Sequence, residues 1–200
     1  MTELEDVVAV LEAGSVVVMP TDTVYGLVAR AVDPAATARL FELKGRRDDA
    51  PLAVLCATVD QALALSAVAG DPAILAVAGR CWPGPLTLVL PRRAGVELHL
   101  GEPAATIGVR VPDDERVRAI AARVGPLAAT SANRHGEAVA VTAAEDREVF
   151  GGGVAAIVDG GRLDARASTV IDATSRPWRV LRDGPLDALE ILATAQDAAG

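Results

Sequence analysis

Three polar residues that could bind a ligand or take part in catalysis, Thr21, Asp22 and Thr23, directly follow an apolar stretch that ends at Pro20. A run of β-branched residues stopped by proline is typical of a strand and its terminating turn. Polar residues beyond a strand often form a solvated turn, but the carboxyl ends of strands in open α/β sheets also hold ligands. The stretch alone is compatible with both interpretations.

Similar polar tips recur after other apolar stretches, in the segments "KGRR", "TIGVR", "TSAN", "AST" and "VLRDG". Taken singly, a serine or asparagine there is more often a cap, and an arginine more often a solvated charge. Together they would bring the cations Lys44, Arg46, Arg110 and Arg182 to one cleft lined by hydroxyls. Arginine forks and a lysine ammonium suit carboxylate and phosphate, so this pattern predicts an anion pocket. The chain has no GxxxxGK[ST], GxGxxG or GxSxG motif.

Lys44 is the only lysine in the chain, because every other fixed side-chain cation is arginine. Such a bias suggests drift in codon usage, which makes the one remaining lysine a candidate worth examining. The plainer interpretation is a solvated lysine after a helix, whose removal would barely affect folding.

Composition limits the class of protein. Two hundred residues with 51% apolar content predict one globular domain over 1–200. The acidic start "MTELEDVV" does not resemble a signal peptide, and no long uncharged apolar run suggests a membrane span, so we expect a cytoplasmic protein. A net charge of −8 argues against coating of nucleic acid by charge, so any RNA binding should be weak or local.

Neither cysteines nor histidines form a metal-ligand pattern. Cys56 and Cys81 match no ligand spacing and are predicted to be small core residues, and His99 and His135 are too few for a histidine-built zinc site. The sequence assigns no metal ligands.

Alternating helical and strand patterns predict a mixed α/β fold, in which helices flank a twisted mixed sheet. Strand-like stretches are expected at 15–19, 51–56, 86–91, 106–112, 125–133, 155–161, 168–173 and 178–184. Helical patterns are expected at 3–13, from Asp33-Pro34 to about 44, at 60–69, 72–80 and 114–124, from 142, and from about 186. Trp82 in "WPGP" is expected in the core.

Seven separated motifs, spanning 20–184, resemble those of the YrdC/TsaC family in order: "PTDTVYGL", "KGR" before "APL", "WPGPLTLVL", "VRVP", "ATSAN", "DGG" before "STVID", and "VLRDG". The resemblance implies an α/β domain with a deep concave site. Some members carry an additional C-terminal domain, and we expect none in this chain, which ends at Gly200. It implies a threonylcarbamoyl-AMP synthase, which joins L-threonine, bicarbonate and ATP, with Mg²⁺, and releases pyrophosphate. The product would pass to a tRNA-modifying threonylcarbamoyl transferase acting at position 37.

The resemblance also implies roles for individual residues. Lys44 and Arg46 would be catalytic and would face the ATP triphosphate. The residues implied for threonine are Thr23, Arg110, Ser131 and Ser168. Those implied for ATP, besides the two cations, are Thr106, Asn133, Thr142 and Arg182. Asp22 could contact a metal or form a turn, and the turn is favoured.

The chain departs from the family pattern at two positions, and two alternative functions remain open. Many family members have proline and a polar residue where this chain has Arg47 and Ala50, which puts an ATP contact at position 50 in doubt. A noncatalytic RNA-binding module is one alternative function. A carbamoyl-transfer domain of the hydrogenase-maturation type is the other.

Overall fold

The computed structural model describes residues 4–45, 51–102, 105–164 and 166–199. Within them, nine strands form one mixed sheet in the order β7-β1-β2-β6-β3-β5-β4-β8-β9. The strands are β1 (Val17–Met19), β2 (Gly26–Arg30), β3 (Ala53–Leu55), β4 (Leu86–Pro91), β5 (Thr106–Arg110), β6 (Leu127–Ser131), β7 (Ala156–Ile157), β8 (Thr169–Asp172) and β9 (Arg179–Arg182).

The helices are α1 (Leu4–Glu12), α2 (Pro34–Lys44), α3 (Val59–Leu63), α4 (Pro72–Cys81), α5 (Glu115–Val124), α6 (Ala143–Phe150) and α7 (Ala188–Asp197). Aspartate side chains cap several of them. Asp33 accepts from the amides of Ala35 and Ala36, and Asp71 caps α4 in the same way. Proline follows each of these two caps, where its fixed φ suits the first helical turn. Asp33 marks the start of α2 and the left-handed Gly45 its end, which makes Lys44 its last residue.

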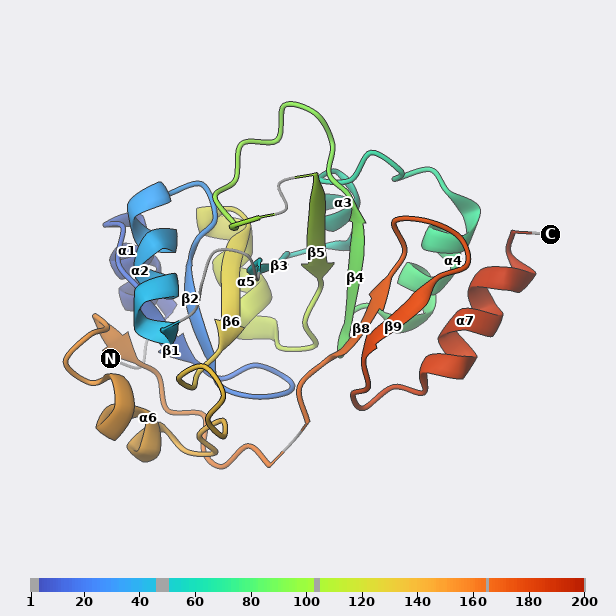
Figure 1. Ribbon diagram of the computed structural model, residues 1–200. Coiled ribbons are helices and arrows are strands. Elements are labelled where there is room, and N and C mark those ends of the chain that lie inside the picture. The colour runs from blue at the N-terminus through green and yellow to red at the C-terminus, as the bar shows by residue number, and fades with distance from the viewer. Residues whose placement is uncertain (1–3, 46–50, 103–104, 165, 200) are drawn as a thin grey trace.

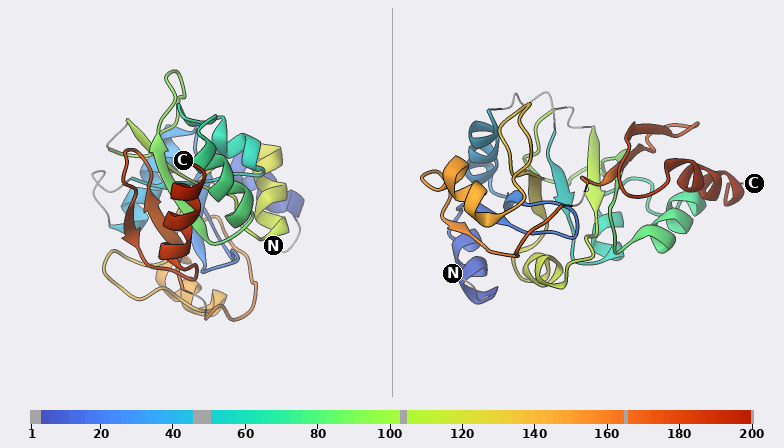
Figure 2. Two further views of the ribbon diagram at one scale, coloured as in Figure 1. Left: turned by 90° about the vertical axis from the view of Figure 1, so that its right-hand side faces the viewer. Right: turned by 90° about the horizontal axis from the view of Figure 1, so that it is seen from below.

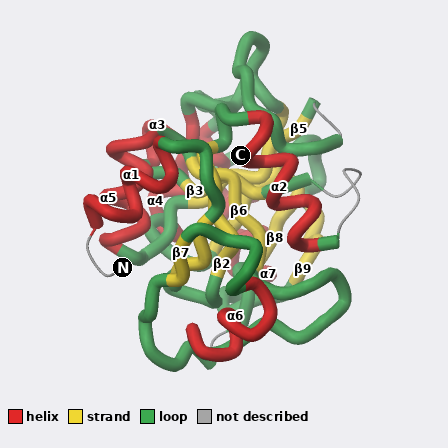
Figure 3. The backbone as a smooth tube through the Cα atoms, turned by 90° about the vertical axis from the view of Figure 1, so that its left-hand side faces the viewer, coloured by secondary structure: helices red, strands yellow, loops and turns green. Residues whose placement is uncertain are grey.

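Helices cover both faces of the sheet. Figure 3 shows α1 and α5 together on one side of β2, β3 and β6, and α2 on the other. One apolar cluster joins α1 and α5 to the sheet, and a larger one packs α2, α4 and α7 against it. Helices α1 and α7 lie at opposite ends of the molecule (Figure 1), and Figure 2 shows α4 beside α7.

The predicted fold class is confirmed: a twisted mixed sheet is flanked by helices. Strand β2 was not predicted, because the sequence pattern left 26–30 as a connection. The predicted helix 60–69 is shorter, since α3 ends at Leu63 and the chain turns so that Ser66 bridges to Arg92.

Trp82 lies in the core, where its indole donates to the carbonyl of Leu86. Cys56 is buried, and Cys81 packs half-buried against the core. The prediction that 1–200 is one domain without a C-terminal addition stays a prediction.

None of the helices in the described part of the chain has the length and apolar character needed to span a membrane.

Asp146 is a buried carboxylate on the inner face of α6. Neither of its oxygens has a hydrogen-bond partner in the structure, and its side chain is fully buried. Burial, with the charge of Glu145 as a second cause, raises the pKa of Asp146 to about 7. Between about pH 4 and pH 7 the folded protein therefore keeps a proton on Asp146 that the unfolded chain releases. The free energy of unfolding falls as pH rises through that window.

Asp146→Ala is expected to change the free energy of unfolding more favourably at pH 8 than at pH 5. A pKa raised from the ordinary value to about 7 corresponds to roughly 2–4 kcal/mol across the window. Urea unfolding of wild type and variant at both pH values measures the difference. Glu148→Ala, an exposed acid on the same helix, is the matched control and should show no such pH dependence. An Asp146→Ala effect that is equal at both pH values would contradict this prediction.

Candidate active site

A cleft of about 370 Å³ lies over one face of the sheet, where alternate residues of β3, β4 and β5 and the end of β6 line it. Its walls come from the β1–β2 turn, α2, β3, β4, β5, β6, the segment before β8, and β9. The polar side chains that line it are Thr21, Thr23, Lys44, Thr87, Thr106, Arg110, Thr130, Ser131, Ser168 and Arg182. Three cations and seven hydroxyls therefore share one concave surface, which suits anionic ligands.

The turn that follows β1 is built by Thr21. Its hydroxyl accepts from the amides of Thr23 and Val24 and donates to the carbonyl of Val24. The turn reverses the chain into β2 and leaves the Thr23 side chain buried against the cleft. The turn therefore depends on Thr21, and the expectation that Asp22 is the turn former is replaced by a different role.

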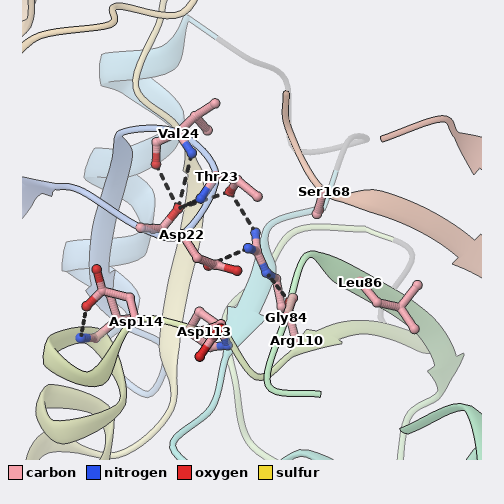
Figure 4. Close-up of polar contacts among 12 residues, drawn as sticks. Asp22, Thr23, Val24, Gly84, Leu86, Arg110, Asp113, Asp114 and Ser168 are labelled. Carbon is pink, nitrogen blue, oxygen red and sulfur yellow. Dashed lines mark hydrogen bonds and ion pairs between the residues drawn. The ribbon is translucent and has the colours of Figure 1, made fainter. Parts of the chain in front are cut away.

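Asp22 forms a buried ion pair with Arg110, the last residue of β5. The Arg110 Nη2 lies 2.5 Å from Asp22 Oδ1, and the two side chains are 7% and 10% exposed. The Arg110 Nη1 donates to the Thr23 hydroxyl at 3.0 Å, and its Nε donates to the carbonyl of Gly84 (Figure 4). Burial lowers the pKa of the Arg110 guanidinium and Asp22 opposes that shift, so Arg110 stays a cation.

Three of the five N–H groups of Arg110 are thus bound to protein. One N–H group remains on each of Nη1 and Nη2 for a ligand in the cleft. A guanidinium that is already fixed by three hydrogen bonds to protein loses little conformational freedom when it binds a ligand. Arg110 is therefore preorganised for a carboxylate in the cleft.

Lys44 is buried, with only 5% of the residue exposed, which makes the interpretation of a solvated surface lysine wrong. Its ammonium donates to the carbonyl of Ser131 at 2.7 Å, to the Ser131 hydroxyl at 3.0 Å, and to Asn133 Oδ1. The Asn133 amide nitrogen in turn donates to two backbone carbonyls beyond β6. The end of α2 and the tip of β6 are therefore joined around one buried charge.

The opposite wall carries Ser168, just before β8. Its hydroxyl lies 2.9 Å from the Thr87 hydroxyl and accepts from Arg182 Nη2 at 2.9 Å. The Arg182 Nε also donates to the Ser168 carbonyl. Gly184 allows this approach, because a Cβ there would lie 2.5 Å from the Ser168 carbonyl carbon.

Tyr25 links the strand behind the cleft to the "DGG" loop. Its hydroxyl donates to the carbonyl of Gly161 and accepts from the amide of Gly160. Gly160 packs so closely on Pro20 that a Cβ would lie 2.5 Å from the proline ring. This contact holds the start of the polar turn in place.

The structure brings most of the predicted site residues together. Lining the cleft are Thr23, Lys44, Thr106, Arg110, Ser131, Ser168 and Arg182. Asn133 lies behind this surface as a partner of Lys44 and Ser131. Thr142 is outside the cleft lining and caps α6, where its hydroxyl accepts from the amide of Glu145. Arg46, Arg47 and Ala50 lie outside the described residues.

Sequence reasoning missed Thr87 and Thr130, which also line the cleft. The signal for Thr87 was a hydroxyl inside the otherwise apolar strand "LTLVLP". In the part of the chain that the structure describes, no group of three or more His, Cys, Asp or Glu side chains could hold a metal ion. Magnesium prefers oxygen ligands and often takes them from substrate phosphates.

A protein-family model for Sua5, YciO and YrdC, described as "Telomere recombination", matches residues 9–184. The chain belongs to the Sua5/YciO/YrdC family. This confirms the family predicted from the motifs. The match covers every strand and each described side chain that lines the cleft.

Relatives of this Sua5/YrdC-family chain include a Pyrococcus abyssi protein named threonylcarbamoyl-AMP synthase, 40% identical over 183 residues. That match covers 90% of this chain and 54% of the relative, so the chain spans about half of that protein. A Mycobacterium tuberculosis relative is 36% identical, with 92% of this chain and 85% of the relative covered. The crystal structure of P. abyssi Sua5 complexed with L-threonine superposes with a TM-score of 0.88 at 37% identity, covering 96% of this chain and 56% of that one.

Proposed function

We propose that this chain is a threonylcarbamoyl-AMP synthase that makes its product and pyrophosphate from L-threonine, bicarbonate and ATP. The observation that carries the proposal is the cleft itself: buried Lys44 and Arg110 and the cleft-lining Arg182 surround a hydroxyl-rich space. Its family membership and the names of its relatives support the same activity.

In the proposed reaction the threonine nitrogen attacks the carbon of bicarbonate, or of the carbon dioxide in equilibrium with it, to give a carbamate. Water is lost when bicarbonate is the donor. A carbamate oxygen then attacks the α-phosphorus of ATP, and the bond to pyrophosphate breaks. Positioning and neutralisation of phosphate charge supply most of the acceleration in such transfers, so no protein nucleophile is required.

Each wall of the cleft has a part in this proposal. Arg110, held by Asp22, binds the threonine carboxylate beside Thr23. Lys44 is proposed to face the phosphates, and Ser131, whose hydroxyl accepts from the Lys44 ammonium, is proposed to hold threonine. Ser168 completes the threonine side, while Thr106, Asn133, Arg182 and, with no contact to support it, Thr142 are proposed for ATP. Arg46 is proposed for the triphosphate from its motif alone.

Magnesium is proposed to enter with ATP, whose phosphates supply oxygen ligands for it. The ion would supply charge neutralisation on the phosphates. We further propose that the adenylate passes to a tRNA-modifying transferase in the cytoplasm.

The direct test is incubation of the protein with ATP, magnesium, bicarbonate and threonine, followed by assay of pyrophosphate and of the adenylate by mass spectrometry. We expect both products, and each should require threonine and bicarbonate. Retention of double-stranded RNA at moderate salt without threonine-dependent turnover would instead support an RNA-binding module. Pyrophosphate release driven by carbamoyl phosphate, in place of threonine and bicarbonate, would support the carbamoyl-transfer alternative.

A further inference from the structure

Thr87 is a buried hydroxyl whose presence the fold alone does not require. It lies in the middle of the sheet on β4, the residue is 5% exposed, and its neighbours along the strand are leucines. A valine of the same shape would fill this position without the cost of burying a hydroxyl. The hydroxyl of Thr87 contacts the Ser168 hydroxyl at 2.9 Å.

The register of the sheet places Thr87 in the proposed threonine site. Leu88 pairs with Val109, so Thr87 and Arg110 lie opposite each other one residue further along, and both line the cleft. On the other side, β4 pairs with β8 so that Thr87 lies beside Val170, close to Ser168. Arg110, Thr87, Ser168 and Arg182 thus form a continuous polar row across adjacent strands.

The hydrogen bonds in this row limit what the Ser168 hydroxyl can do. Its oxygen accepts from Arg182, and a hydroxyl has one proton and two acceptor sites. Either hydroxyl can be the donor in the contact between Thr87 and Ser168. When Thr87 donates, both acceptor sites of Ser168 are filled, and the Ser168 proton is left for a ligand in the cleft that both residues line.

A donor in this position selects among the polar groups of threonine. The threonine nitrogen has to keep its lone pair available for the attack on bicarbonate, so it is not the group that this donor binds. The carboxylate has its own partner in the two remaining N–H groups of Arg110. The threonine hydroxyl, borne on the carbon next to the carboxylate-bearing one, can accept the Ser168 proton.

We propose that Thr87 is a specificity-determining residue that positions the Ser168 hydroxyl to bind the side-chain hydroxyl of threonine. The inference rests on the proposed synthase function and identifies how its amino-acid substrate is chosen. Thr87 itself acts through Ser168.

The test compares Thr87→Val and Thr87→Ser with wild type, with threonine and valine as competing substrates. Valine replaces the threonine hydroxyl by a methyl group. We expect Thr87→Val to lower kcat/KM for threonine about tenfold, mainly through KM, as loss of one oriented hydrogen bond predicts. The KM for ATP and any turnover of valine should stay unchanged, so the preference for threonine falls. Thr87→Ser should retain the preference, because it keeps the donor.

Thermal unfolding separates this effect from damage to the fold, since Thr87→Val preserves shape and should leave the melting temperature within a few degrees. An unchanged preference for threonine in Thr87→Val, or equal losses with threonine and valine, would overturn the inference while leaving the proposed function intact. Absence of threonine-dependent turnover in the wild type would overturn the proposed function itself, and the inference with it.

Discussion

Lys44→Met should lower the rate of threonylcarbamoyl-AMP formation by about 10²–10³-fold, the scale on which one preorganised charge stabiliser acts. The ammonium of Lys44 is held at the tip of β6 by Ser131 and Asn133, so its position is fixed before substrate arrives. Methionine keeps the aliphatic stem that packs in this buried position but removes the charge. Steady-state pyrophosphate release under saturating threonine and bicarbonate measures the effect.

Loss of Lys44 will also affect folding, because the substitution leaves partly buried acceptors on Ser131 and Asn133 without their donor. The expected cost is about 1–3 kcal/mol in the free energy of unfolding, measured in urea. Arg39→Met is the matched control: it removes an exposed cation from the same helix and should leave turnover unchanged. If Lys44→Met stays folded and retains near-wild-type turnover, Lys44 does not face the phosphates.

Arg110→Lys should lower kcat/KM for threonine by about 10²-fold while the KM for ATP changes little. A lysine preserves the charge but cannot reach Asp22, Thr23 and Gly84 at once and still present two parallel donors to a carboxylate. Threonine and ATP are each titrated at saturating concentrations of the other substrate.

The carboxylate assignment of Arg110 has a direct check in threoninol, which lacks that group. Wild type should bind threoninol weakly, and Arg110→Lys should bind it no more weakly than wild type does. If ATP affinity collapsed in Arg110→Lys while threonine use was retained, Arg110 would belong to the nucleotide side.

Strand ends, caps and breaks were predictable because their causes are local. The dipeptides Asp33-Pro34 and Asp71-Pro72 predict the start of a helix, and α2 and α4 begin at these two positions. Strand β2 was missed because the reversal before it depends on the Thr21 hydroxyl bonding to the Thr23 and Val24 amides, a contact that composition does not reveal.

The candidate site was predictable as a set of residues but not as a set of contacts. Lys44 ends a helix, where a long cation is normally solvated, and only the distant tip of β6 explains its burial. The ion pair between Asp22 and Arg110 joins residues far apart in the chain, so no local pattern indicates it. Thr87 needed the sheet register before its face toward the cleft could be assigned.

The strand order also bears on how this protein acquires its activity as it folds. The sheet pairs β4 with β8, strands separated by most of the second half of the chain, and the cleft needs residues from Thr21 to Arg182. Sequence-distant pairings of this kind give a high contact order and slow folding. On a ribosome, α1 to β6 emerge well before β8 and β9, so a nascent chain can form part of the core while one wall of the cleft is missing. Substrate binding can therefore stabilise only the last stage of folding.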